Sequence, residues 1–72
     1  MNVQLEYEFE TEQHAYRFLN TAVHMDADGL KVRLGQSDHH VRVTYQYTEG
    51  AFDSTASDLD DLAHQLGGEE LR

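Results

Sequence analysis

The sequence predicts an α+β domain, a two-layer sandwich in which a three-stranded sheet carries two helices on one face, in the chain order βαββα. Three segments alternate apolar and polar residues with the period of a strand, and two segments repeat apolar residues with the period of a helix. A chain of 72 residues has room for one domain. We place that domain at residues 1–68 and expect residues 69–72 to form a frayed tail.

Residues 2–9 predict the first strand, and residues 12–25 predict the first helix. The strand has an apolar residue at every second position: Val3, Leu5, Tyr7 and Phe9. The helix repeats apolar residues at the spacing of an amphipathic stripe: Ala15, Phe18, Leu19, Ala22 and Val23. Thr11 is the expected N-cap of this helix, because its hydroxyl can accept a hydrogen bond from a backbone N–H of the first turn.

Two further strands and a second helix follow. Alternating apolar residues predict strands at residues 30–34 and 40–48, and the short polar segment between them predicts a hairpin. Leucines at helical spacing predict a helix over residues 55–66, which Gly67 and Gly68 end. Asp53, Ser54 and Thr55 all qualify as its N-cap, and Thr55 with Asp58 has the spacing of a capping box.

These elements predict the strand order 1-3-2. The helix between the first two strands makes them parallel, and the third strand lies between them, antiparallel to both. The helices then cover one face of the sheet. The other face stays open and carries Glu6, Glu8 and Glu10 beside Arg42, with Lys31 and Arg33 on the second strand. Both edges of this sheet are left unpaired.

The charge of the chain excludes several classes of partner. The sequence has 14 Asp and Glu against 5 Lys and Arg, which gives a formal net charge of -9. Such a chain is repelled by nucleic acid and by anionic membranes, so we expect neither as a partner. The composition resembles that of haloarchaeal proteins, in which concentrated salt screens the repulsion between acidic residues. We expect a cytoplasmic location, because no apolar run has the length of a membrane span and the start lacks the features of a secretory signal.

The sequence favours a protein without enzymatic activity, and it predicts no catalytic, cofactor-binding or metal-binding residues. The serines lack the context of a nucleophile elbow, and Glu6, Glu8 and Glu10 lie on an open face rather than in a desolvated cleft. His39 and His40 are adjacent in a strand, so their side chains point to opposite faces and do not share a metal ion. The segment 24–29 resembles the start of a calcium loop but lacks its first and last acidic ligands.

Part of the chain resembles the pterin-4a-carbinolamine dehydratase family. The resemblance covers the segments Tyr7-Glu8-Phe9, Phe18-Leu19, 41–45 and 58–63, which occur in the family's order. The family's leading helix and strand have no counterpart here. Its catalytic His-His-Pro segment is also absent. The corresponding region, residues 24–29, has neither a pair of histidines nor a proline. The resemblance therefore implies a topology and association through strands, and it transfers no catalytic residue.

Two functions remain open from the sequence. The first is protein–protein interaction or self-association, with a homodimer formed through a sheet edge or with another protein as partner. The second is a degenerate, pterin-dehydratase-like domain that binds a small ligand. For the second function we expect a small pocket lined by Tyr45, Tyr47 and Phe52.

Overall fold

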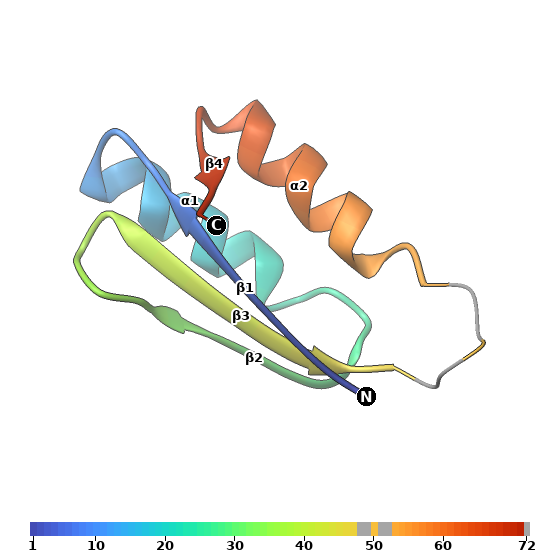
Figure 1. The fold of residues 1–72 in the computed structure, drawn as a ribbon. Coiled ribbons are helices and arrows are strands. Elements are labelled where there is room, and N and C mark those ends of the chain that lie inside the picture. The colour runs from blue at the N-terminus through green and yellow to red at the C-terminus, as the bar shows by residue number, and fades with distance from the viewer. Residues whose placement is uncertain (48–49, 51–52, 72) are drawn as a thin grey trace.

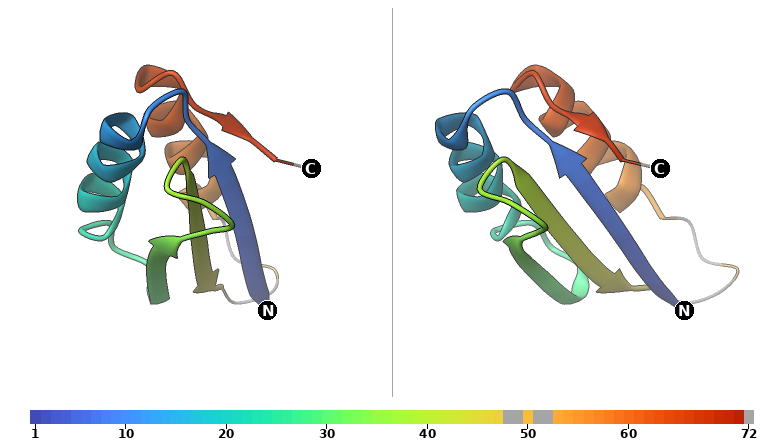
Figure 2. Two further views of the ribbon diagram at one scale, coloured as in Figure 1. Left: turned by 90° about the vertical axis from the view of Figure 1, so that its left-hand side faces the viewer. Right: turned by 60° about the vertical axis from the view of Figure 1, so that its left-hand side comes forward.

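The computed structural model describes residues 1–47, 50 and 53–71, which form two layers (Figure 1). A sheet forms one layer and two helices form the other, on a single face of the sheet (Figure 2). The elements are β1 (Asn2–Glu8), α1 (Glu12–Ala22), β2 (Asp28–Leu34), β3 (His40–Gln46), α2 (Thr55–Gln65) and β4 (Glu69–Glu70). The predicted α+β class and the position of both helices are therefore confirmed.

The first three strands adopt the predicted order. The whole sheet has the order β2-β3-β1-β4, and every pair of neighbours is antiparallel. Along β1 and β3, Leu5 lies opposite Val43 on the face that the helices cover. Glu6 lies opposite Arg42 on the other face. The register therefore separates apolar from charged side chains, as the alternation in sequence requires.

The prediction of three strands was wrong, because Glu69–Glu70, which we expected within the frayed tail, form a fourth strand. These residues pair with Tyr7 and Glu8 of β1, and the Leu71 N–H donates to the Glu6 carbonyl at 2.7 Å. A two-residue strand is too short to show a period in sequence. With it the order of elements becomes βαββαβ, the split βαβ arrangement of ferredoxin-like domains.

Helix α1 begins as predicted and ends earlier. The Thr11 Oγ1 accepts a hydrogen bond from the His14 N–H at 3.1 Å, which confirms Thr11 as the N-cap. The helix ends at Ala22 rather than at residue 25. The Met25 N–H donates to the carbonyl of Ala22, three residues earlier, as in a 3₁₀ turn. The α-helical pattern, in which donor and acceptor are four residues apart, therefore ends here.

Helix α2 begins at Thr55 as predicted and ends at Gln65, one residue before the predicted end. Its N-cap is Ser54, which makes no capping bond through its side chain, so the capping box predicted at Thr55 and Asp58 is absent. The Thr55 N–H donates instead to Asp53 Oδ1 at 3.0 Å. The C-terminal stop is a Schellman motif, because the Gly67 and Gly68 N–H groups donate to the carbonyls of His64 and Ala63.

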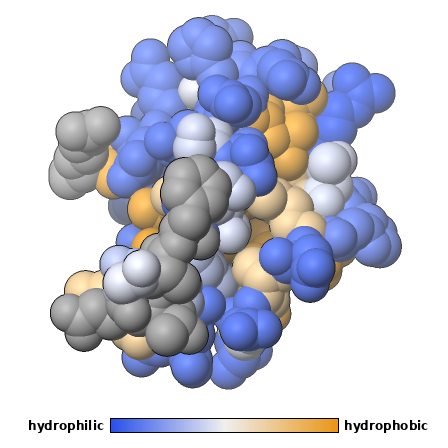
Figure 3. All heavy atoms as spheres, turned by 90° about the vertical axis from the view of Figure 1, so that its right-hand side faces the viewer, coloured by the Kyte–Doolittle hydropathy of each residue, from blue (hydrophilic) through white to orange (hydrophobic). Residues whose placement is uncertain are grey.

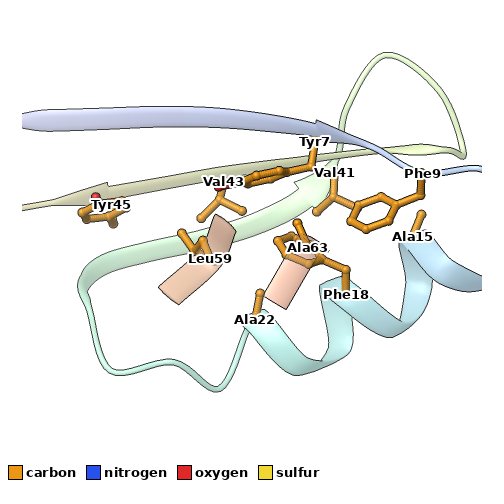
Figure 4. Packing of buried hydrophobic residues seen from close by; sticks show 10 residues of the cluster. All are labelled: Tyr7, Phe9, Ala15, Phe18, Ala22, Val41, Val43, Tyr45, Leu59 and Ala63. Atoms are coloured by element: carbon orange, nitrogen blue, oxygen red, sulfur yellow. The ribbon is translucent and has the colours of Figure 1, made fainter. Parts of the chain in front are cut away.

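The hydrophobic core lies between the sheet and the helices, and Figure 4 shows side chains from both layers meeting there. Phe18 on α1 packs against two aromatic residues, Tyr7 of β1 and Phe9 directly after β1. Its ring centroid lies 5.1 Å from the ring centroid of each. Hydrophilic residues surround the face seen in Figure 3, and apolar residues show between them in several places. The buried side chains of this core, among the described residues, are Tyr7, Phe9, Ala15, Phe18, Ala22, Val41, Val43, Tyr45, Leu59 and Ala63.

Candidate functional site

The predicted aromatic pocket is not assembled by the described residues. Tyr45 is only 2% exposed, and its ring is part of the hydrophobic core (Figure 4). Its hydroxyl donates to Asp53 Oδ2 at 2.9 Å. Tyr47 is half-buried directly after β3, and Phe52 lies outside the described residues. A site that joins all three side chains therefore stays a prediction.

The adjacent histidines belong to the hairpin between β2 and β3. His40 Nε2 lies 3.2 Å from Glu8 Oε2, and the other ring nitrogen of His40 is hydrogen-bonded to Ser37 Oγ. The His39 N–H also donates to Ser37 Oγ, at 3.1 Å. These contacts hold the turn against the end of β1. Within residues 1–47, 50 and 53–71, no three His, Asp or Glu side chains are placed to hold a metal ion.

The open face of the sheet carries an ion pair at its centre. Arg42 Nε and Nη2 both lie 3.1 Å from Glu6 Oε1, and Gln36 Nε2 donates to Glu6 Oε2 at 3.0 Å. The hydrogen bond from Gln36, with that from Arg42, lowers the pKa of the Glu6 carboxyl. Glu6 therefore stays ionised and fixes the position of the Arg42 guanidinium.

Beside this pair, three basic side chains line a hollow of about 200 Å³. Arg33 on β2 lies directly opposite Arg42 on β3, and Lys31 lies opposite Thr44. Leu34 and Thr44 complete its lining, and among the residues that the structure describes no acidic one lines it. In a chain with 5 basic residues in all, this hollow therefore collects Lys31, Arg33 and Arg42.

A second hollow, of about 520 Å³, adjoins the first and shares Lys31 and Thr44 with it. Its lining also includes three residues with side-chain amides, Asn2 and Gln4 of β1 and Gln46 of β3. Gly29 also lines it, at the point where the register between β2 and β3 shifts. Its φ of +62° is a left-handed conformation that glycine adopts without strain, as in a β-bulge.

The two edges of the sheet differ. One edge is β4, a strand of 2 residues, Glu69 and Glu70. The other is β2, a strand of 7 residues that pairs only with β3 in the part of the chain that the structure describes. The Gly35 N–H donates to the His40 carbonyl at 2.7 Å. Since backbone groups in an antiparallel ladder alternate in direction, Val32 and Leu34 present their N–H and C=O groups to the free edge.

A flank of α1 lies next to this free edge. On the other flank, His14 and Arg17 line a hollow together with Gln65 and Leu66, so α2 lies on that side. Tyr16 follows His14 by about 200° around the helix, and Val23 lies two turns further along the same flank as Tyr16. This flank therefore faces away from α2, on the side where α1 packs against β2.

Comparisons of the chain with protein-family models, with curated proteins and with solved structures find no match. The resemblance to pterin-4a-carbinolamine dehydratases accordingly stays a prediction. No helix among the described residues has the length and apolar character that crossing a membrane requires. The free edge of β2 and the hollows on the open face are two surfaces of this protein that could bind a partner or a ligand.

Sequence reasoning had located part of this site. It placed Lys31, Arg33 and Arg42 on the open face, and the register confirms this placement. It did not predict the hollow, because the depth of a surface depends on side-chain conformations that a strand period does not specify. It also did not distinguish the edges, because the strand that covers part of β1 has only two residues.

Proposed function

We propose that this chain is a small interaction domain that pairs with a second copy of itself through the free edge of β2. The supporting observation is that residues 30–34, Leu-Lys-Val-Arg-Leu, alternate apolar and basic residues in the same way in both directions. An antiparallel pair of identical strands places each residue opposite its image across a two-fold axis. A strand with this near-palindrome is therefore complementary to itself.

The backbone of β2 fits a two-fold axis at Val32. In that register the outward N–H and C=O of Val32 bond with those of Val32 in the second copy, as a hydrogen-bonded pair of an antiparallel ladder. Leu30 then lies opposite Leu34 of the second copy. The apolar side chains of both strands stay on the helix face, so the core continues across the axis.

Exposed apolar side chains support this edge as the interface. The described residues include four large apolar side chains that are exposed: Met1, Tyr16, Val23 and Leu34. Leu34 is 40% exposed at the end of β2, and Val23 is 46% exposed on the flank of α1 beside that strand. A second copy at the β2 edge covers both. A domain of this size gains from a core that extends into a partner.

Repulsion between like charges opposes the pairing of the two β2 strands. With the axis at Val32, Lys31 lies opposite Arg33 of the second copy, and like charges directly opposite each other destabilise a strand pair. Both side chains are exposed on the open face, so salt screens their repulsion. The net charge of -9 on each copy adds a repulsion that salt also screens. We therefore expect a dimer that strengthens as the salt concentration rises.

Sedimentation velocity at low and at molar KCl tests the proposal. We expect a dimer that is favoured by salt and lost in Val32→Pro, since proline removes the outward N–H of Val32 and none of the bonds between β2 and β3. Val32→Thr is the matched control, because it keeps the N–H and the β-branched shape. The expected result for this control is a dimer.

A second variant keeps the test decisive if proline disturbs the strand. Leu34→Lys adds a charge to a side chain that is already 40% exposed, so the single copy folds and the interface is lost. A single species of monomer mass at every salt concentration, up to about millimolar protein, overturns the proposal. So does a dimer that Val32→Pro and Leu34→Lys leave unchanged.

A further inference from the structure

The hollow lined by Lys31, Arg33 and Arg42 stands out against the charge of the rest of the chain. The sequence has almost three acidic residues for each basic one, 14 against 5. Among the described residues, however, the lining of this hollow has three basic residues and no acidic one. Charged residues of one sign gathered on a concave surface concentrate the local potential. The hollow is therefore a locally positive site on an acidic protein.

This arrangement has a cost for the fold. Arg33 and Arg42 are directly opposite each other in the β2–β3 ladder, a placement of like charges that destabilises a strand pair. The Glu6 carboxylate neutralises the charge of the Arg42 guanidinium, with which it forms an ion pair. Within the described part of the chain, Arg33 and Lys31 have no carboxylate within salt-bridge distance. Two positive charges of the hollow are thus left for a ligand to neutralise.

We propose that this hollow binds an oxyanion group, a phosphate or a carboxylate, of a polar small molecule. A planar guanidinium donates two parallel hydrogen bonds to such a group, and two arginines, Arg33 and Arg42, are directly opposite each other in this strand pair. The ion pair with Glu6 holds Arg42 in position before a ligand arrives. The Thr44 hydroxyl and the Lys31 ammonium supply further donors at the same hollow.

The adjoining hollow indicates what the rest of the ligand is. It offers about 520 Å³, a volume in the range of small-molecule sites, and it shares Lys31 and Thr44 with the positive hollow. The amides of Asn2, Gln4 and Gln46 both donate and accept hydrogen bonds. The body of the ligand is therefore uncharged and polar, with hydroxyl or amide groups, and the oxyanion is its one charged end.

The site and the proposed dimer interface share strand β2, which carries Lys31, Arg33 and Leu34, but they differ in the groups they use and in their tests. Oxyanion binding uses side chains on the open face, whereas pairing of β2 uses its outward backbone groups and the apolar face. A monomer that binds oxyanions would overturn the dimer and keep this site. A dimer that binds no oxyanion would overturn this site and keep the proposed dimer.

Titration of the isotope-labelled protein by NMR tests the site, with inorganic pyrophosphate and citrate as separate probes in the same KCl background. We expect saturable shifts of the backbone amides of Lys31, Arg33, Arg42 and Thr44. Arg33→Gln removes an unpaired charge that faces solvent, so the fold persists and the affinity falls by about tenfold or more. Arg17→Gln is the matched control, because it removes an arginine on α1 that does not line this hollow.

The two probes separate the sources of the oxyanion. Saturation with pyrophosphate alone assigns the site to phosphate groups, and saturation with citrate alone assigns it to carboxylates; either result supports the proposal. Shifts that rise without saturation with both probes indicate an adventitious ion only and overturn it. Equal losses of affinity in Arg33→Gln and Arg17→Gln also overturn it, because they indicate general electrostatic attraction rather than a site.

Discussion

The aromatic ring of Phe9 lies so close to the backbone of Gly68 that no space for a Cβ remains between them. Both residues are buried, and Phe9 also contacts Phe18 of α1 through their rings. The close approach brings the chain that leaves α2 back over the end of β1. It therefore places Glu69–Glu70 where they can pair with Tyr7 and Glu8.

Gly68→Ala tests this contact. A Cβ at this position would lie 2.7 Å from Phe9 Cδ2, so the ring or the backbone has to move. We expect the free energy of unfolding to fall by about 1–3 kcal/mol, the usual effect of overpacking. Urea unfolding measures it. Gly67→Ala is the control, since its Cβ meets no atom within 4 Å and its cost comes only from the φ of +78°. A smaller loss in Gly68→Ala than in Gly67→Ala would contradict the expectation.

Tyr7→Phe tests the link between β1 and α2. The Tyr7 hydroxyl donates to Asp60 Oδ1 at 2.6 Å, and the two residues are 53 positions apart in sequence. Removing a hydrogen bond to a charged acceptor at a partly buried site costs about 1–2 kcal/mol. Thermal or urea unfolding measures this loss. Tyr16→Phe, at a side chain that is 49% exposed, is expected to change stability by much less. Equal effects of the two variants would argue against a structural role for the Tyr7 hydroxyl.

Stability is expected to fall at alkaline pH. Burial, and then the hydrogen bond to Asp53, raise the pKa of Tyr45 to about 12 in the folded protein. An unfolded tyrosine has a pKa of about 10. A group with a raised folded pKa contributes stability below its unfolded pKa and loses it as pH rises, so the loss falls between about pH 10 and pH 12. Urea unfolding across this range measures it, and Tyr45→Phe is expected to reduce the slope. An unchanged slope in this variant would assign the loss to other groups.

Salt is expected to stabilise the domain. The net charge is -9, and the ladder places Glu8 directly opposite Glu69, a like-charge pair on the edge of the sheet. The Debye length shortens from about 10 Å at 0.1 M to about 3 Å at 1 M salt, so repulsion between exposed carboxylates fades. We expect the Tm to rise from 0.05 to 1 M NaCl, and to rise less in Glu69→Gln. A flat or falling curve would refute the salt-adapted interpretation of the composition.

Periodicity predicted what depends on long, regular segments. The alternation of β1 and β3 and the apolar stripes of both helices fixed the layers and the order of three strands, since each has a single face that can be buried. Features that depend on one or two contacts were missed. Glu69–Glu70 pair because Gly68 fits under Phe9, and Thr55 donates to Asp53 rather than taking part in a capping box.

The candidate site was less accessible to sequence reasoning than the fold. The alternation assigns Leu34 to the apolar face, but its 40% exposure follows from its position at a free edge. Tyr45 was expected at a pocket, and the structure buries its ring in the core (Figure 4). Only the register of the strands shows that the like charges of Arg33 and Arg42, nine positions apart in sequence, are directly opposite each other.

The central position of β1 also has a consequence during synthesis. β1 precedes both of its partners in the chain, residues 40–46 and 69–70. Until those residues leave the ribosome, the alternating apolar side chains of β1 have no sheet to join. The hairpin of β2 and β3 closes through local contacts such as that between Gly35 and His40, and it can form without β1. We therefore expect the nascent domain to fold only after its second half is made, and the pairing of β1 with residues far along the chain to slow this step.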